Sequence, residues 1–256
     1  MHSEFGEAEP RAGNYFSLTR TATYSFLAAL PLFLAYEVLI LVVNQGTEMP
    51  IRVGADLWIK QAMAAMGATG VFSVGVAVLL IGTAIFVRER RKRLPIHGSY
   101  FMAMIGESLM YAILVAFLVS TVVGLVFPRA ASVSPGISGA GLQPLGTLNM
   151  LVLSIGAGLY EELVFRVLLV GGLFWTFRNF SADQNSAYIV AAVIGAIAFS
   201  AVHYIGPLGD AFQMSSFFFR FLFGLALNAL FLVRGFGVAA WTHALYDILV
   251  VSQIIG

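Results

Sequence analysis

The chain of 256 residues contains no cysteine and few charged residues. The lack of cysteine excludes disulfide frameworks, thiolate metal sites and cysteine nucleophiles. Only 11% of the residues are charged, whereas about a quarter are charged in a typical soluble domain. No stretch interleaves basic and aromatic side chains, so we expect no nucleic-acid partner. With 59% hydrophobic residues and a mean hydropathy of +0.89, the composition predicts a polytopic membrane protein embedded in a lipid bilayer.

Seven apolar windows reach the roughly 20 residues that one membrane crossing needs. They are 23–44, 62–87, 101–127, 148–177, 187–205, 212–233 and 236–255. These windows predict an all-α fold, a polytopic transmembrane helix bundle with about seven to eight spans. The fourth window is longer than one crossing, so we expect Gly156 and Gly158 to break it and to leave Leu148–Ile155 as an interfacial piece. Segment 56–66 is also expected at the membrane interface, with Trp58 and Lys60 at headgroup level.

The orientation follows from the sequence RERRKR at 88–93, in which five of six residues are basic. The positive-inside rule places this short loop in the cytoplasm. Alternating spans then put the amino terminus inside and the carboxyl terminus outside. Residues 1–20 are too polar for the core of a signal peptide and are expected to form a cytoplasmic tail.

The windows fall into two groups around a loop rich in Gly, Ser and Pro. We expect a tail at 1–20, amino-terminal membrane helices at 21–127, the loop at 128–147, and a helical core at 146–256 that carries the catalytic residues. The concentrated polar residues all lie in the second group of helices. The second group is therefore the place to look for chemistry.

The fourth window, which contains GLYEELVFRVLLV at 158–170, holds two glutamates and an arginine. A charge in hydrocarbon costs several kcal/mol unless it is paired or faces a polar cavity. Glu162 and Arg166 are four residues apart, share a helix face and are expected to form a supporting ion pair. Glu161 points about 100° away and has no such partner. The pattern favours Glu161 as a functional carboxylate.

Two further windows place histidines on helix faces. Phe199 and His203 are four residues apart near the outer end of one span, with Phe199 in a supporting role. His243 and Asp247 are four apart in the last span. Alternating topology brings these side chains and Glu161 to a common depth. A carboxylate and imidazoles in a cleft that excludes bulk water are suited to activating a water molecule.

The remaining charges within the apolar windows have simpler interpretations. Arg220 is expected to pair with a carboxylate of a neighbouring helix or to extend to an interface, and binding of a substrate carboxylate is its second interpretation. Glu37 and Glu107 lie in helices without a motif and are expected to be structural or interface residues.

Three short motifs occur in order in successive spans: EELVFR matches EExxxR, FSAVH matches FxxxH, and HALYD matches HxxxN/D. In these motifs the chain resembles the CPBP intramembrane proteases, the relatives of the CAAX prenyl endopeptidases that are also called the Abi family. The resemblance covers about residues 146–256, and the amino-terminal helices carry no matching motif. It implies an integral protein of a prokaryotic inner or plasma membrane.

The resemblance also implies roles for the motif residues. Glu161 would be the general base that activates water, assisted by His203. His243 and Asp247 would orient the substrate carbonyl or stabilise the oxyanion. Many catalytic members have Asn where this chain has Asp247. Because an ionised Asp cannot donate a hydrogen bond, Asp247 must be protonated, orient His243 or bind a cation.

The sequence therefore predicts an intramembrane endopeptidase of the glutamate type. Its substrate would be a protein or peptide, lipidated or with a carboxyl-terminal membrane tail, cut near that end, and no cofactor would be required. One alternative is a metal-dependent hydrolase with zinc or another divalent ion on Glu161, His203, His243 and Asp247. The others are a proton-coupled transporter that uses three of these residues as a relay, and a non-catalytic immunity or binding protein.

Overall fold

The computed structural model describes residues 14–47, 50–68, 73–128, 146–181, 183–206 and 209–255, and throughout these ranges the regular structure is helical. The all-α prediction is confirmed. Of the expected tail at 1–20, residues 1–13 lie outside the described residues, and Tyr15–Thr19 form the short helix α1. The predicted loop at 128–147 falls almost wholly outside the described residues.

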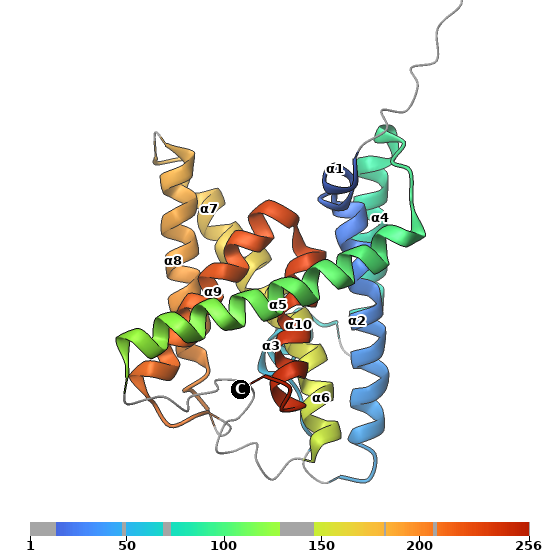
Figure 1. Ribbon diagram of the computed structural model, residues 1–256. Helices are drawn as coiled ribbons and strands as arrows, with labels where there is room; N and C mark the ends of the chain where they lie inside the picture. Colours follow the sequence, from blue (N-terminus) through green and yellow to red (C-terminus); the bar gives the residue numbers. More distant parts are fainter. Residues whose placement is uncertain are drawn as a thin grey trace, which may run out of the picture.

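Six of the seven predicted windows correspond to a helical stretch, whereas the window 62–87 covers the end of one helix, a turn at Met66 and Gly67, and most of the next helix (Figure 1). In the amino-terminal half the elements are α2 (Ala22–Val43), α3 (Gly54–Ala65), α4 (Ser73–Glu89), η1 (Arg90–Lys92) and α5 (Gly98–Val126). The carboxyl-terminal half contains α6 (Thr147–Gly156), η2 (Ala157–Glu161), η3 (Leu163–Val170), α7 (Gly171–Phe177), α8 (Gln184–Val202), α9 (Met214–Arg234) and α10 (Phe236–Val251). Within the described ranges, four helices are long and apolar enough to cross a membrane on their own, namely α2, α5, α8 and α9, and α10 is a shorter apolar helix. The figure of seven to eight spans therefore stands as an approximate count.

Helix α10 lies at the centre of the bundle and packs against α2, α5, α6, η2 and α9 (Figure 1). Small side chains on one part of its surface allow this close packing. Ala239, Ala240 and Ala244 are completely buried on it, and small residues of this kind let membrane helices approach closely. The central position of α10 allows its polar residues, His243 and Asp247, to reach several helices at once.

The fourth window forms one unbroken helical stretch from Thr147 to Phe177, so the expected break at Gly156 and Gly158 was wrong. Both glycines lie within the helix, where the lack of a side chain allows neighbouring elements to pack closely. A Cβ at Gly156 would lie 2.3 Å from the ring of Tyr36, and one at Gly158 would lie 2.5 Å from Ala244. The stretch has π-helical hydrogen bonding in η2 and η3. Segments of this type are rare and are frequent at functional sites.

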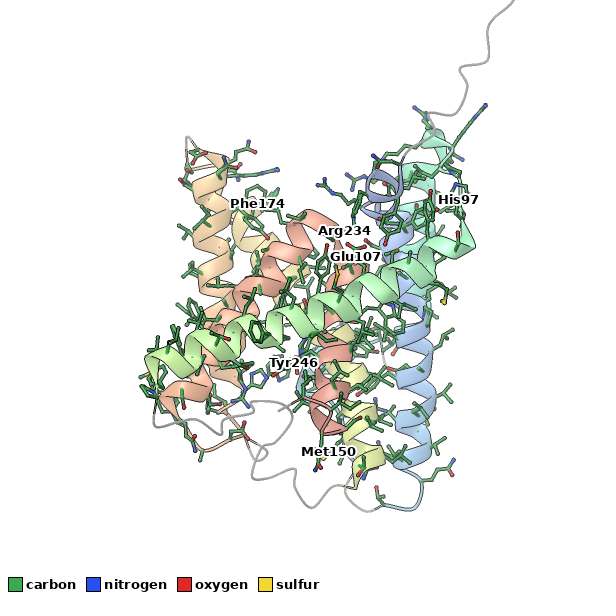
Figure 2. The ribbon with its side chains drawn as sticks, in the orientation of Figure 1. His97, Glu107, Met150, Phe174, Arg234 and Tyr246 are labelled. Atoms are coloured by element: carbon green, nitrogen blue, oxygen red, sulfur yellow. The ribbon has the colours of Figure 1, made fainter. Side chains whose placement is uncertain are left out.

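A polar network ties α1 to α5 and α9 at one end of the molecule, where Figure 2 labels Glu107 and Arg234. Arg234 Nε lies 2.5 Å from Glu107 Oε1, and its Nη2 donates to Glu107 Oε2 at 2.7 Å. The Tyr15 hydroxyl donates to the same carboxylate at 2.6 Å. Arg234 also donates to the Thr19 hydroxyl at 2.9 Å. Glu107 is thus a structural residue, as the sequence predicted.

Candidate active site

Glu162 is the most deeply buried charge of the predicted site. Its side chain is fully buried, and its Oε2 lies 3.1 Å from Nε of Arg166, itself 1% exposed. The expected ion pair between these two residues is confirmed. The sequence did not reveal a second partner: Nδ1 of His243, on α10, lies 2.8 Å from Glu162 Oε1. Glu162 therefore joins the first and the third motif.

Phe199 lies at the centre of this cluster. The guanidinium carbon of Arg166 lies 4.5 Å from the centroid of the Phe199 ring, a distance at which a cation is attracted by the ring face. The edges of two imidazoles complete the contacts, with ring centroids 5.0 Å away for His203 and 5.7 Å away for His243. One buried aromatic ring on α8 thus contacts residues of all three motifs, which fits the supporting role expected for it.

His203 follows the last residue of α8 and is half-buried. Its Nδ1 lies 2.7 Å from the backbone oxygen of Phe199. Because a carbonyl oxygen only accepts hydrogen bonds, Nδ1 must carry the proton of this contact. The lone pair of a neutral His203 is then on Nε2. This nitrogen is suited to receiving a proton or holding a water molecule.

Asp247 is nearly buried, and its Oδ2 lies 3.6 Å from Nε2 of His243, one turn earlier on α10. His243 thus has a carboxylate near each ring nitrogen, Glu162 on one side and Asp247 on the other. Because 3.6 Å is too long for a hydrogen bond, the Nε2–H of a doubly protonated ring stays available for a substrate, while its Nδ1–H is directed at Glu162. Such a ring is a candidate for stabilising negative charge that develops on a substrate.

Glu161 differs from its neighbour Glu162 in having no partner. It is half-buried, and its Oε2 is buried without a hydrogen-bond partner among the described residues. It is near enough to His243 and Arg166 for their charges to act on it. The structure thus brings Glu161, His203, His243 and Asp247 into one cluster around Phe199, with Glu162 and Arg166 behind it. The catalytic roles of these residues stay predictions.

Arg220 lies next to this cluster, close enough for its charge to act on His203 and Asp247. It is 5% exposed and pairs with Asp210, and its Nη1 also donates to the hydroxyls of Tyr204 and Ser216, each at 2.9 Å. The expected ion pair exists, but the partner lies in the segment between α8 and α9. The expectation that this partner lies on a neighbouring helix was wrong.

The predicted metal ligands were also tested against the geometry. Among the residues that the structure describes, no group of three or more His, Asp and Glu side chains is arranged to hold a metal ion. Both imidazole Nδ1 atoms are already engaged, His203 by a carbonyl and His243 by Glu162. Whether the protein requires a metal stays a prediction.

Fold and site together define a class: a helical membrane protein with a buried cluster of carboxylates, imidazoles and one arginine. Residues 143–249 match the model of a family described as type II CAAX prenyl endopeptidase, Rce1-like. This match extends from the start of α6 into α10, contains all three motifs, and confirms the resemblance inferred from them. It supports a protease in a membrane. No curated protein and no solved structure matches the chain.

Proposed function

We propose that this protein is an intramembrane endopeptidase in which Glu161 activates a water molecule to hydrolyse a peptide bond. The observation that carries the proposal is the contrast between adjacent glutamates. Among the described residues, Glu161 and Glu162 each have a buried oxygen without a hydrogen bond, but Glu162 forms ion pairs with Arg166 and His243 whereas Glu161 forms none. A stranded polar atom costs about 1–3 kcal/mol, and a chain that tolerates this cost at a motif position has a use for the free carboxylate.

The proposed reaction uses only groups of this chain and water. Glu161 takes a proton from water as the oxygen adds to the substrate carbonyl, and Nε2 of His203 helps to hold that water. His243 donates from Nε2 to the developing oxyanion. Asp247 either stabilises the positive charge of the His243 ring as an anion or carries a proton itself. The proton on Glu161 then passes to the leaving nitrogen, and the C–N bond breaks. Preorganised donors of this kind typically contribute about 3–4 kcal/mol to transition-state stabilisation.

The supporting residues fix the donors. The Nδ1–H of His243 points at Glu162, and Arg166 holds Glu162 in place. Such a carboxylate behind an imidazole fixes the ring orientation and stabilises its protonated form. We therefore assign Glu162, Arg166 and Phe199 to positioning, and Glu161, His203, His243 and Asp247 to catalysis.

The proposed substrate is a protein or peptide cut near its carboxyl end or membrane tail, lipidated or not. The family name refers to prenylated substrates. The basic residues at 88–93 favour a cytoplasmic location for that end of the bundle. Helix α8 runs away from that end, so His203, just after its last residue, lies toward the outer side. A substrate whose tail enters from the outer leaflet fits this topology.

A comparison of membrane proteomes tests the proposal. Cells that express wild type should contain new protein termini that are absent with Glu161→Gln and with His203→Ala. Tyr15→Phe is the control, because it removes one hydroxyl from another network of the membrane helices and leaves the ion pair of Glu107 with Arg234 intact, and it should keep the new termini. Identical termini in wild type and Glu161→Gln membranes would contradict the proposal.

The other predicted functions give different results in the same cells. A proton-coupled transporter would show coupled flux and no cleavage products, and an immunity or binding protein would protect cells even as Glu161→Gln. A metal-dependent hydrolase would lose cleavage on chelation and regain it with zinc. Metal analysis of the purified protein distinguishes this last case from a glutamate-type enzyme.

A further inference from the structure

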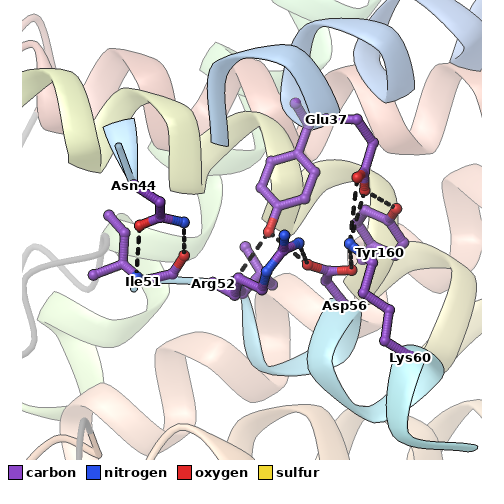
Figure 3. A network of polar contacts seen from close by, with 9 residues as sticks. Glu37, Asn44, Ile51, Arg52, Asp56, Lys60 and Tyr160 are labelled. Carbon is purple, nitrogen blue, oxygen red and sulfur yellow. Dashed lines mark hydrogen bonds and ion pairs between the residues drawn. The ribbon is translucent and has the colours of Figure 1, made fainter. Parts of the chain in front are cut away.

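Two amino-terminal helices reach the segment that carries Glu161 through a polar network, and the members of this network on those two helices lie outside the matched region (Figure 3). The hydroxyl of Tyr160, the residue before Glu161, donates to Oε1 of Glu37 on α2 at 2.6 Å. Lys60 on α3 holds the same carboxylate, with Nζ 3.1 Å from Oε1 and 3.3 Å from Oε2. Lys60 also pairs with Asp56 at 2.7 Å. Three separate elements, α2, α3 and η2, thus share one network.

The network continues from Lys60 to Asp56, which forms ion pairs with both Lys60 and Arg52. Asp56 is fully buried and receives hydrogen bonds from Arg52 at 2.8 Å and from the Tyr36 hydroxyl at 3.0 Å. The backbone N–H of Val53 donates to the Tyr36 hydroxyl at 3.2 Å. Two cations and two carboxylates balance one another, so no charge of this network is free to bind a ligand. Its function must lie in holding something in place.

The network holds the π-helical segment η2 in place. On one side the ring of Tyr36 packs edge-on against the ring of Tyr160, with centroids 5.3 Å apart, and leaves no room for a Cβ at Gly156. On the other side a Cβ at Gly158 would lie 2.5 Å from Ala244 of α10, so there is no room for a side chain here either. Tyr160 is 2% exposed, and the only hydrogen bond of its hydroxyl in the described part of the chain goes to Glu37. The network therefore fixes how η2 is rotated about its axis.

Rotation of η2 directly affects the catalytic carboxylate, because Glu161 is its last residue. Unlike Glu162, Glu161 has no side-chain partner to hold it, so its backbone must do so. A misplacement of about 1 Å can reduce a catalytic rate about a hundredfold. We propose that Glu37 and Lys60 are positioning residues that act on Glu161 through Tyr160. This inference rests on the proposed function, because it assumes that Glu161 is the general base.

The network around Glu107 provides a matched control. There the Tyr15 hydroxyl also donates to a glutamate at 2.6 Å, and that glutamate also pairs with a cation, Arg234. This second network connects α1, α5 and α9 and includes no residue of η2. Tyr15→Phe and Tyr160→Phe thus each remove a tyrosine hydroxyl that donates to a paired glutamate. Only Tyr160→Phe should affect catalysis.

The first measurement is steady-state cleavage of an internally quenched peptide that ends in a prenylated cysteine and three further residues. Tyr160→Phe, Glu37→Gln and Lys60→Met should each lower kcat by about tenfold or more, which corresponds to about 1.4 kcal/mol. KM should stay within about twofold, because these residues do not touch substrate. Lys60→Arg should restore much of the rate. Tyr15→Phe should leave kcat unchanged.

The second measurement does not depend on activity. A hydrophobic carbodiimide modifies carboxyl groups in membranes, and mass spectrometry gives its rate of reaction at Glu161. That rate should change at least threefold in Tyr160→Phe, Glu37→Gln and Lys60→Met and stay at the wild-type value in Tyr15→Phe. If wild type does not cleave the peptide but labelling changes as expected, the proposed function fails and the positioning stands. Wild-type labelling in all three network variants, or equal losses of kcat in Tyr15→Phe and Tyr160→Phe, would overturn the inference.

Discussion

The carboxylates on the helices of the two halves of the chain differ in their partners. In the described amino-terminal helices, Glu37, Asp56 and Glu107 each have a lysine or arginine within ion-pair distance. In the carboxyl-terminal helices, Asp247 has only an imidazole 3.6 Å away, and Glu161 has no partner. A buried charge with a full partner holds helices together, and a buried charge without one reduces stability. The difference indicates that the amino-terminal charges serve the fold and that the carboxyl-terminal charges serve a reaction.

Glu162 follows the amino-terminal rule although it lies in the first motif. Removing its partner should therefore have the largest effect on stability. We expect Arg166→Ala to lower the free energy of unfolding by about 3–5 kcal/mol, because Glu162 remains buried with His243 alone. Cleavage should be lost as well, since Arg166 no longer fixes Glu162, the carboxylate that orients His243.

Thermal unfolding in detergent measures this effect. Arg178→Ala is the control, because Arg178 is exposed just after the end of α7 and forms no ion pair within the described residues. It should unfold with wild type. An Arg166→Ala protein that unfolds at the wild-type temperature would remove the distinction between paired and unpaired charges.

Asp247 tests the other side of the comparison. Asn offers an N–H donor where a protonated Asp offers O–H. We expect Asp247→Asn to keep cleavage within about threefold of wild type, or less than about 1 kcal/mol, and to unfold at a temperature no lower. A loss of tenfold or more at every pH would show instead that Asp247 works as an anion, either orienting His243 or binding a cation.

The pattern within each helix was predictable from the sequence. Side chains four residues apart meet on one face, and this rule anticipated three contacts: Glu162 with Arg166, Phe199 with His203, and His243 with Asp247. Six of the seven apolar windows likewise anticipated one helical stretch each. Glu161 could be singled out because the same rule gave it no partner.

Contacts between helices were not predictable in this way. The hydrogen bond between His243 and Glu162 depends on how closely α10 approaches η2, and that approach depends on small residues such as Gly158 and Ala244. The pairing of Arg220 with Asp210 depends on the path of the chain after α8. The π-helical segments also escaped prediction, since their hydrogen-bond pattern leaves no clear mark in the apolar spacing.

The smallest effect is expected at a carboxylate outside the membrane helices. Asp183 caps α8 and accepts hydrogen bonds from the Ser186 hydroxyl at 2.6 Å and from the backbone N–H groups of Ser186 and Asn185. The Ser186 hydroxyl, followed by the two backbone donors, lowers the pKa of Asp183 below its ordinary value of 3.8. A lowered pKa in the folded state adds stability above about pH 4 that is lost as the carboxylate is protonated at lower pH.

Asp183→Ala should therefore lower the unfolding temperature slightly at pH 7, and the difference from wild type should shrink toward pH 3. Cleavage at pH 7 should not change. A difference that grows as the pH falls would contradict this assignment of the cap.

The central claim is that adjacent glutamates have opposite roles, and Glu161→Gln compared with Glu162→Gln tests it most directly. Unfolding temperature and cleavage are measured for both variants in the same detergent. Glu161→Gln should lose cleavage and unfold no lower than wild type, because an unpartnered buried carboxyl is replaced by a neutral group. Glu162→Gln should unfold well below wild type, because Arg166 loses its counterion. An active, destabilised Glu161→Gln beside an inactive Glu162→Gln of wild-type stability would show that the two roles are reversed.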